Sequence, residues 1–186
     1  MFKRLHQVPI LSIIGMACCF AALIIAGAAT AQQQPAAAMA SLPAVAPVMD
    51  CAQLPAAHIA AATDTPLHIT AAAVVQDGVP AAYCEVQGYV EPHIQFEVRL
   101  PVKGWTQRFL ETGCGGQCGN LEIRLTNYKG CYPAEHGELA LASTDMGHRG
   151  GIDGVWAKDN AQAKIDFAYR GVHETAVAAK AVIAKY

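Results

Sequence analysis

The stretch Gly113-Cys114-Gly115-Gly116-Gln117-Cys118-Gly119 places four glycines and two cysteines within seven positions. Glycine adopts left-handed backbone angles at little steric cost, so successive main-chain N–H groups in such a loop can converge on one anion. An oxyanion, a carboxylate or a phosphate would each fit, and a glycine-rich turn clamped by a disulfide is the alternative. A phosphate-binding P-loop is excluded, because no Gly-Lys-Ser/Thr follows the glycines.

Strand patterns lead into this loop from its N-terminal side. Residues 94–100 (IQFEVRL) alternate apolar and polar side chains, and this period of two predicts a strand with one face toward solvent. Pro101 and Gly104 then turn the chain, and residues 108–112 (RFLET) form the strand that enters the loop. Two earlier strands are predicted by residues 67–75 (LHITAAAVV) and 83–90 (YCEVQGYV).

A buried strand and a helix follow the loop. Residues 138–144 (ELALAST) are an apolar run of the kind found in the middle of a sheet. Residues 159–186 change to a helical period, capped by Asp159 or Asn160. We expect the Asp166–Arg170 and Arg170–Glu174 pairs to lie on its exposed face. The predicted apolar stripe consists of Ile165, Ala168, Tyr169, Val172, Ala176, Ala179, Ile183 and Tyr186.

The N-terminal residues predict export. Lys3 and Arg4, an apolar run and the sequence Ala29-Thr30-Ala31 are typical of a signal peptide over residues 1–31, cleaved after Ala31. An uncleaved membrane anchor is the alternative, because the apolar run is long. Residues 32–50, rich in Pro, Ala and Gln, predict a tether, and residues 51–186 predict the folded domain. The formal charge of −2 leaves no basic surface for nucleic acid, which we exclude as a partner.

Five cysteines remain after removal of the leader: Cys51, Cys84, Cys114, Cys118 and Cys131. An exported chain favours disulfides, and an odd number implies a free thiol, an intermolecular bridge or a partner outside this chain. Cys51 and Cys84 form the natural pair, whereas the pairing among the other three stays open.

Two constellations near the loop resemble reactive sites only loosely. Cys114, Cys118, Cys131 and His136 have the pattern C-x3-C-x12-C-x4-H, but in an oxidising compartment two of these cysteines bridge more readily than they bind zinc, so we predict no metal site.

Ser143, Asp145 and His148 contain the three residue types of a hydrolytic triad within six positions. Neighbours on one turn rarely provide the geometry of a triad, and Ser143 does not lie in G-x-S-x-G. We expect Asp145 and His148 to brace the turn by hydrogen bonds to the backbone, with Ser143 buried at the end of its strand. We therefore assign no catalytic residue in this chain.

The chain resembles the tannase and feruloyl esterase family of secreted α/β-hydrolases from about Cys51 to Tyr186. The resemblance rests on motifs in the family's order and spacing: CEVQGYV (84–90), IQFEVRLP (94–101), Trp105, RFL (108–110), GCGGQCG (113–119), STDMGH (143–148) and DFAYR (166–170). It implies an α/β-hydrolase fold, here its incomplete N-terminal part, which ends before the nucleophile elbow. The implied activity is that of a serine esterase on aromatic acid esters such as gallate or ferulate esters.

The resemblance also implies roles for individual residues. Gly116, with Gly115 beside it, would supply the oxyanion-hole N–H from this half of the site. Cys51 and Cys84 match the family's N-terminal disulfide. Asp145 and His148 match its Thr-Asp-x-Gly-His turn, where we expect them to support the site without transferring a proton.

The family's Gly-Cys-Ser-x-Gly-Gly elbow and its lid domain, which often binds calcium, are not found in this sequence. We therefore expect the nucleophile downstream of Tyr186, no cofactor in this chain, and a fragment that is inactive alone. The full-length form would act on a small aromatic ester in a secreted or periplasmic location, without a stable membrane partner once the leader is cleaved. The alternatives are a secreted module that binds a carboxylate in residues 113–119, and a non-catalytic, disulfide-stapled envelope domain.

Overall fold

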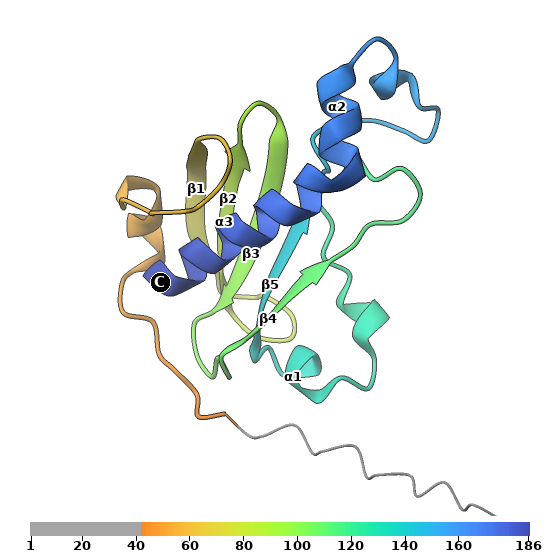
Figure 1. The fold of residues 1–186 in the computed structure, drawn as a ribbon. Coiled ribbons are helices and arrows are strands. Elements are labelled where there is room, and N and C mark those ends of the chain that lie inside the picture. The colour runs from red at the N-terminus through yellow and green to blue at the C-terminus, as the bar shows by residue number, and fades with distance from the viewer. Residues whose placement is uncertain (1–41) are drawn as a thin grey trace, which may run out of the picture. The chain divides into compact units, whose positions relative to one another are not determined.

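Five strands form one mixed sheet in the computed structural model, which describes residues 42–186 (Figure 1). Their order across the sheet is β1-β2-β3-β5-β4. All neighbouring pairs are antiparallel except β4 and β5, which run parallel. The strands are β1 (Leu67–Val75), β2 (Tyr83–Val90), β3 (Ile94–Pro101), β4 (Arg108–Thr112) and β5 (Leu139–Thr144), which agree with the predicted strands.

Helical segments occupy the connections and the C-terminal end. Among them, α3 lies diagonally across one face of the sheet in Figure 1. The short segments are the 3-10 helices η1 (Cys51–Ala56), η2 (Leu125–Tyr128) and η3 (Val155–Ala157) and the helix α1 (Tyr132–Glu135). The C-terminal helix consists of α2 (Ala161–Ile165), a π-helical turn η4 (Asp166–Arg170) and α3 (Gly171–Lys185).

The main core lies between the sheet and α3. Phe96 and Val98 of β3 and Ala142 of β5 pack with Ala178 and Val182 of α3, all fully buried. This confirms the predicted apolar face of residues 94–100. The opposite face is less exposed than predicted, since Glu97 there keeps only 9% of its surface accessible. A second cluster, formed by Ile123, Ala134, Leu139 and Leu141, contributes apolar contacts beside β4 and β5.

The C-terminal helix buries a different face from the one predicted. Ile165, Tyr169 and Val172 of the predicted apolar stripe are exposed, whereas Asp166 and Arg170 are buried. The reason is the set of buried partners of Arg170, because its pairs with Asp64 and Asp166 hold this side of the helix against the rest of the domain. Asn160 caps the helix as predicted, since its side-chain oxygen accepts a hydrogen bond from the backbone N–H of Ala163.

A charged network accounts for the buried polar face of this helix. Arg170 donates from Nε and Nη2 to the two carboxylate oxygens of Asp64, at 2.7 and 2.6 Å, and it also pairs with Asp166. The backbone N–H of Asp64 donates to Glu174 at 3.0 Å. The hydrogen bond from Arg170 lowers the pKa of Asp64 and raises that of Arg170. The pairs predicted to lie in solvent therefore fasten the helix to the loop before β1.

Two disulfides and one free thiol account for the five cysteines. Cys51 of η1 is bonded to Cys84 of β2, and both are buried in the main core. Cys114 is bonded to Cys118 across the glycine-rich loop, and Cys131 is free. The pairing that the sequence left open is thus local to the loop.

The predicted leader and most of the predicted tether lie outside the described residues. The end of the tether contacts the domain: Val45 forms a β-bridge with Trp105, and the backbone N–H of Val48 donates to the carbonyl of Tyr186. Within residues 42–186, every helix is too short or too polar to cross a lipid bilayer.

Replacement of Arg170 by leucine should destabilise the fold strongly. The Arg170→Leu variant leaves Asp166, which is fully buried, without its cationic partner, and we expect a loss of about 3–5 kcal/mol in the free energy of unfolding. Arg124→Leu is the matched control, because it breaks an exposed pair with Glu122 and should cost less than about 1 kcal/mol. Urea unfolding followed by circular dichroism measures both, and equal losses would contradict a structural role for the buried network.

Candidate functional site

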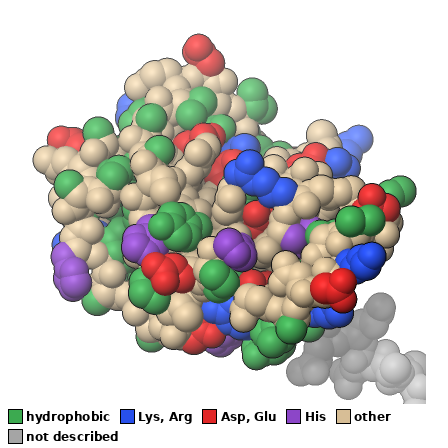
Figure 2. All heavy atoms as spheres, turned by 90° about the horizontal axis from the view of Figure 1, so that it is seen from above, with side chains coloured by type: hydrophobic (Ala, Val, Ile, Leu, Met, Phe, Trp, Pro, Cys, Tyr) green, Lys and Arg blue, Asp and Glu red, His purple; other side chains and the backbone are tan. Residues whose placement is uncertain are grey.

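The candidate site lies where the two parallel strands end. In register, Arg108 of β4 faces Leu139 of β5 and Thr112 faces Ser143, so both strands end at the same edge of the sheet. Parallel strands in α/β proteins carry their sites at this carboxyl edge. The glycine-rich loop, residues 113–119, follows β4, and the Asp145 to His148 turn follows β5. Figure 2 views the molecule from above Figure 1, and it shows acidic, basic and histidine side chains scattered over this face.

The glycine-rich loop contains a tight turn closed by covalent and hydrogen bonds. The backbone N–H of Cys118 donates to the carbonyl of Gly115 at 3.1 Å, and the Cys114–Cys118 disulfide spans the same turn. Gly116 has φ +61° and Cys118 has φ +61°. Gly116 is open on its Cβ side, where the nearest atom is a methyl carbon of Ile152 at 4.0 Å. The Cβ side of Gly116 is therefore free of close contacts with the described residues.

Asp145 ties the end of β5 to β3. One of its carboxylate oxygens accepts hydrogen bonds from the backbone N–H groups of Gln95 and Gly147, each at 2.9 Å. The side chain is buried, and this burial raises its pKa to about 6 even though the two hydrogen bonds favour the ionised form. The expectation that Asp145 braces the turn through backbone hydrogen bonds is confirmed.

His148 takes a different role from the one expected. Its ring is buried and stacks on Trp156, with centroids 3.8 Å apart, and contacts Phe167 edge-on. Within residues 42–186 neither ring nitrogen has a hydrogen-bond partner. The prediction of a backbone hydrogen bond from His148 is therefore wrong, because its aromatic neighbours contact the ring instead.

The two loosely matched constellations are not assembled. The Ser143 hydroxyl is buried without a partner among the described residues, and Asp145 bonds to backbone N–H groups instead of to His148. The C-x3-C-x12-C-x4-H pattern loses two potential thiolates to the Cys114–Cys118 disulfide. His136 stacks on Tyr132, and its Nδ1 lies 2.9 Å from the carbonyl oxygen of that residue. No group of metal-ligating side chains is found in the described part of the chain.

A hollow of about 200 Å³ lies beside the glycine-rich loop. It is lined by the Cys114–Cys118 disulfide and mainly by apolar atoms, with Met146 and Val172 on the side of β5 and α3. The one carboxylate in its wall is Glu111, whose Oε1 is buried without a partner among the described residues. Burial raises the pKa of Glu111 to about 7, against a weaker opposing effect of Lys180.

Sequence reasoning overlooked Glu111, although a signal was present. Phe109 and Glu111 alternate along β4 and lie on the same face of the strand, and Phe109 packs against the main core. A charged residue on the core face of a strand is unusual, so its position could have marked it. Trp156 was also overlooked, because it belongs to none of the motifs, and Gln117 was given no role although it lies within the glycine-rich loop.

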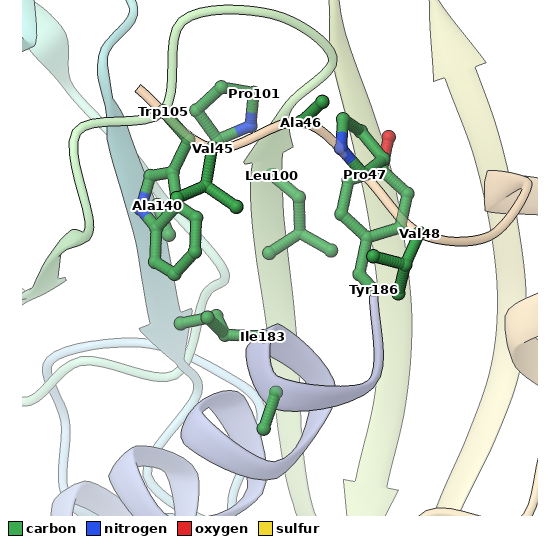
Figure 3. Close-up of a pocket in the computed structure, with 11 residues that line it drawn as sticks. Val45, Ala46, Pro47, Val48, Leu100, Pro101, Trp105, Ala140, Ile183 and Tyr186 are labelled. Atoms are coloured by element: carbon green, nitrogen blue, oxygen red, sulfur yellow. The ribbon is translucent and has the colours of Figure 1, made fainter. Parts of the chain in front are cut away.

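A second hollow of about 200 Å³ lies at the opposite end of the sheet (Figure 3). Leu100 lies near the end of β3 there, Trp105 precedes β4 and Ala140 lies near the start of β5, and the described end of the tether forms one wall. Figure 3 shows the rings of Trp105 and Tyr186 on opposite sides of this hollow. It has no carboxylate, histidine or glycine-rich loop in its wall, so it is not a candidate for ester chemistry.

Residues 74–186 match the family described as tannase and feruloyl esterase, which is more than half of the chain. The chain belongs to this family. It is 34% identical over 140 residues to an uncharacterized esterase of Xanthomonas campestris pv. campestris, an alignment that covers 72% of this chain and 23% of that protein. It is 36% identical over 91 residues to feruloyl esterase B of Aspergillus niger, which covers 47% of this chain and 16% of that protein.

The fold agrees with that of a solved feruloyl esterase. The crystal structure of feruloyl esterase B from Aspergillus oryzae superposes with a TM-score of 0.53 at 25% identity, covering 64% of this chain and 27% of that chain. The described residues thus form part of an α/β-hydrolase fold, as the sequence predicted. The chain spans roughly a quarter or less of the length of these relatives. Family membership supports an esterase function.

The raised pKa of Glu111 predicts a pH-dependent stability. A carboxyl whose pKa rises on folding stabilises the fold below its ordinary pKa, and this contribution is lost as the pH rises through about 7. The Glu111→Gln variant cannot ionise, so it should be more stable than the wild type at pH 8 by about 1–2 kcal/mol, with the full effect reduced by partial solvent exposure. This difference should shrink toward pH 4.

Urea unfolding at the two pH values measures this effect. The exposed Glu122→Gln variant is the control, because it removes the same charge from the surface. An advantage of Glu111→Gln that is equal at pH 4 and pH 8 would show that the pKa of Glu111 does not rise on folding.

Proposed function

We propose that this chain forms the oxyanion-binding part of a serine carboxylic ester hydrolase that acts on aromatic acid esters such as gallate or ferulate esters. The observation that carries the proposal is the glycine-rich loop, held at the carboxyl edge of the parallel strands with an open turn at Gly116. Membership of the tannase and feruloyl esterase family supports the reaction class.

The loop suits this role because ester hydrolysis develops negative charge on the carbonyl oxygen. Donors that are already fixed in position stabilise this oxyanion without reorganisation during the reaction. Here the N–H of Gly116, with that of Gly115 beside it, would donate to the oxyanion. The Cys118 to Gly115 hydrogen bond and the disulfide restrict the motion of both groups. Asp145 would support the site by fixing the adjacent turn, and His148 by packing beneath it.

Two features support an aromatic acid as the substrate. Relatives of this chain are named feruloyl esterases, and the hollow beside the loop has a mainly apolar wall. The sequence contains no G-x-S-x-G, so we propose that the attacking serine and its triad partners follow Tyr186. No cofactor held by this chain takes part in the proposed chemistry. The two disulfides favour an oxidising, extracytoplasmic compartment, in line with the predicted leader.

The DNA downstream of the Tyr186 codon tests the origin of the nucleophile. Translation in frame, or after one frameshift, should give a Gly-Cys-Ser-x-Gly-Gly sequence, and its absence would refute the proposed serine esterase. The product of the extended gene should hydrolyse methyl gallate or methyl ferulate, whereas the 186-residue chain should hydrolyse neither. An extended product that binds methyl ferulate without hydrolysing it would favour the secreted binding module.

Substitution of Gly116 tests the oxyanion assignment. In the extended gene product, Gly116→Val should lower kcat by about 10²-fold with little change in KM, because a side chain at φ +61° displaces the donors. Gly104→Val is the control, since Gly104 also has a positive φ with open space around it but lies in the turn before β4. Steady-state kinetics on methyl ferulate distinguish the two, and an unchanged kcat in Gly116→Val would remove Gly116 from the mechanism.

A further inference from the structure

Trp156, which belongs to none of the motifs described above, anchors the glycine-rich loop through a side-chain hydrogen bond. Gln117 lies between the two bonded cysteines, and its side-chain oxygen accepts a hydrogen bond from the indole N–H of Trp156 at 3.1 Å. Trp156 belongs to η3, which is 39 residues away in sequence. The loop is therefore tied to a separate segment by a side-chain contact, in addition to its own disulfide.

Aromatic packing fixes the indole itself. Trp156 stacks on His148 with ring centroids 3.8 Å apart and an interplanar angle of 17°, and it tilts against Phe167 at 5.0 Å. His148 is 7% exposed, and within residues 42–186 its ring nitrogens have no partner. The His148 imidazole contacts both aromatic rings, and this packing holds the indole in the orientation in which its N–H donates to Gln117.

Gln117 lies at a position of the loop where anchoring matters. In the turn closed by the Cys118 to Gly115 hydrogen bond, Gly116 and Gln117 are the two central residues. Rotation of the peptide between them would redirect the Gly116 carbonyl and the Gln117 N–H and change the backbone angles of Gly116, whose own N–H is the proposed donor. A fixed Gln117 side chain opposes this rotation. Gly119 strengthens the same attachment, because its backbone lies against Gly150, where a Cβ atom would approach the carbonyl oxygen to 2.5 Å.

We propose that Trp156 is a positioning residue for the glycine-rich loop: its N–H holds Gln117, and the His148 and Phe167 rings hold the indole. The role of this anchor in catalysis rests on the proposed esterase function, whereas the anchoring itself does not. The groups proposed to touch the reacting ester remain the main-chain N–H groups of Gly115 and Gly116, and Trp156 acts on them through Gln117.

Amide hydrogen exchange in the 186-residue chain tests the anchor directly. Trp156→Phe keeps an aromatic ring but removes the N–H donor, so the amide of Cys118, whose hydrogen bond to Gly115 closes the turn, should exchange about threefold to tenfold faster. Trp105→Phe is the matched control, because it removes the equivalent hydrogen bond to the carbonyl of Arg108 at the other end of β4. Unchanged exchange in Trp156→Phe would overturn the proposal.

A double-variant cycle tests whether Trp156 acts through Gln117. Gln117→Met removes the acceptor while keeping the length of the side chain, so the double variant should exchange no faster than either single variant. Rates that multiply in the double variant would show independent effects and overturn the pairing.

Kinetics of the extended gene product separate positioning from general structure. Trp156→Phe should lower kcat on methyl ferulate by about tenfold with KM within about twofold. The reason is that displaced N–H donors weaken the binding of the transition state more than the binding of the substrate. An unchanged kcat beside faster exchange would leave Trp156 a structural residue and overturn its positioning role. Absence of ester hydrolysis by the wild type would refute the proposed function, while the exchange data would still decide the anchor.

Discussion

The parallel pairing of β4 with β5 is the constraint on which the candidate site depends. Every other neighbouring pair in the sheet is antiparallel and places consecutive strand ends at opposite edges. Only the β4–β5 register brings Thr112 beside Ser143, so that the glycine-rich loop and the Asp145 turn leave the sheet together. A tight hairpin cannot make a parallel connection, and the long segment between the two strands, which includes η2 and α1, is the result.

The buried network of the C-terminal helix packs against the carboxyl edge of β4 and β5. Asp166, held by Arg170, lies directly under Gly147, where a Cβ atom would come within 2.5 Å of the Asp166 Cβ. Gly171 likewise approaches the backbone of Met146, at 2.8 Å from its would-be Cβ. The Asp145 to His148 turn therefore rests on the π-helical turn and its junction with α3, and two glycines permit the close approach. The buried Asp166–Arg170 pair and the π-helical turn that contains it thus lie directly against the candidate site.

Local patterns predicted most of the fold, and long-range contacts limited the rest. Alternation identified β3 and the apolar run identified β5. These patterns are visible in the sequence because a strand in this sheet buries at least one face, whichever strand is its neighbour. The orientation of the helix was mispredicted, since nothing near Arg170 in the sequence shows that Asp64 will meet it 106 residues away. For the site, glycine content marked the loop and the Asp145 turn. The stack of His148 on Trp156 could not be inferred, because it depends on how the intervening segment folds back.

The position of β4 at the end of the sheet has a consequence for the physical behaviour of this chain. Within the described residues β4 has a neighbouring strand on one side only, so its other side is an edge of the sheet. Such an edge is a template for pairing with a further strand, whether from the same molecule or from another copy. Because this edge adjoins the glycine-rich loop, self-association there would bring a second chain next to the candidate site. Any self-association at this edge would therefore also restrict access to the glycine-rich loop.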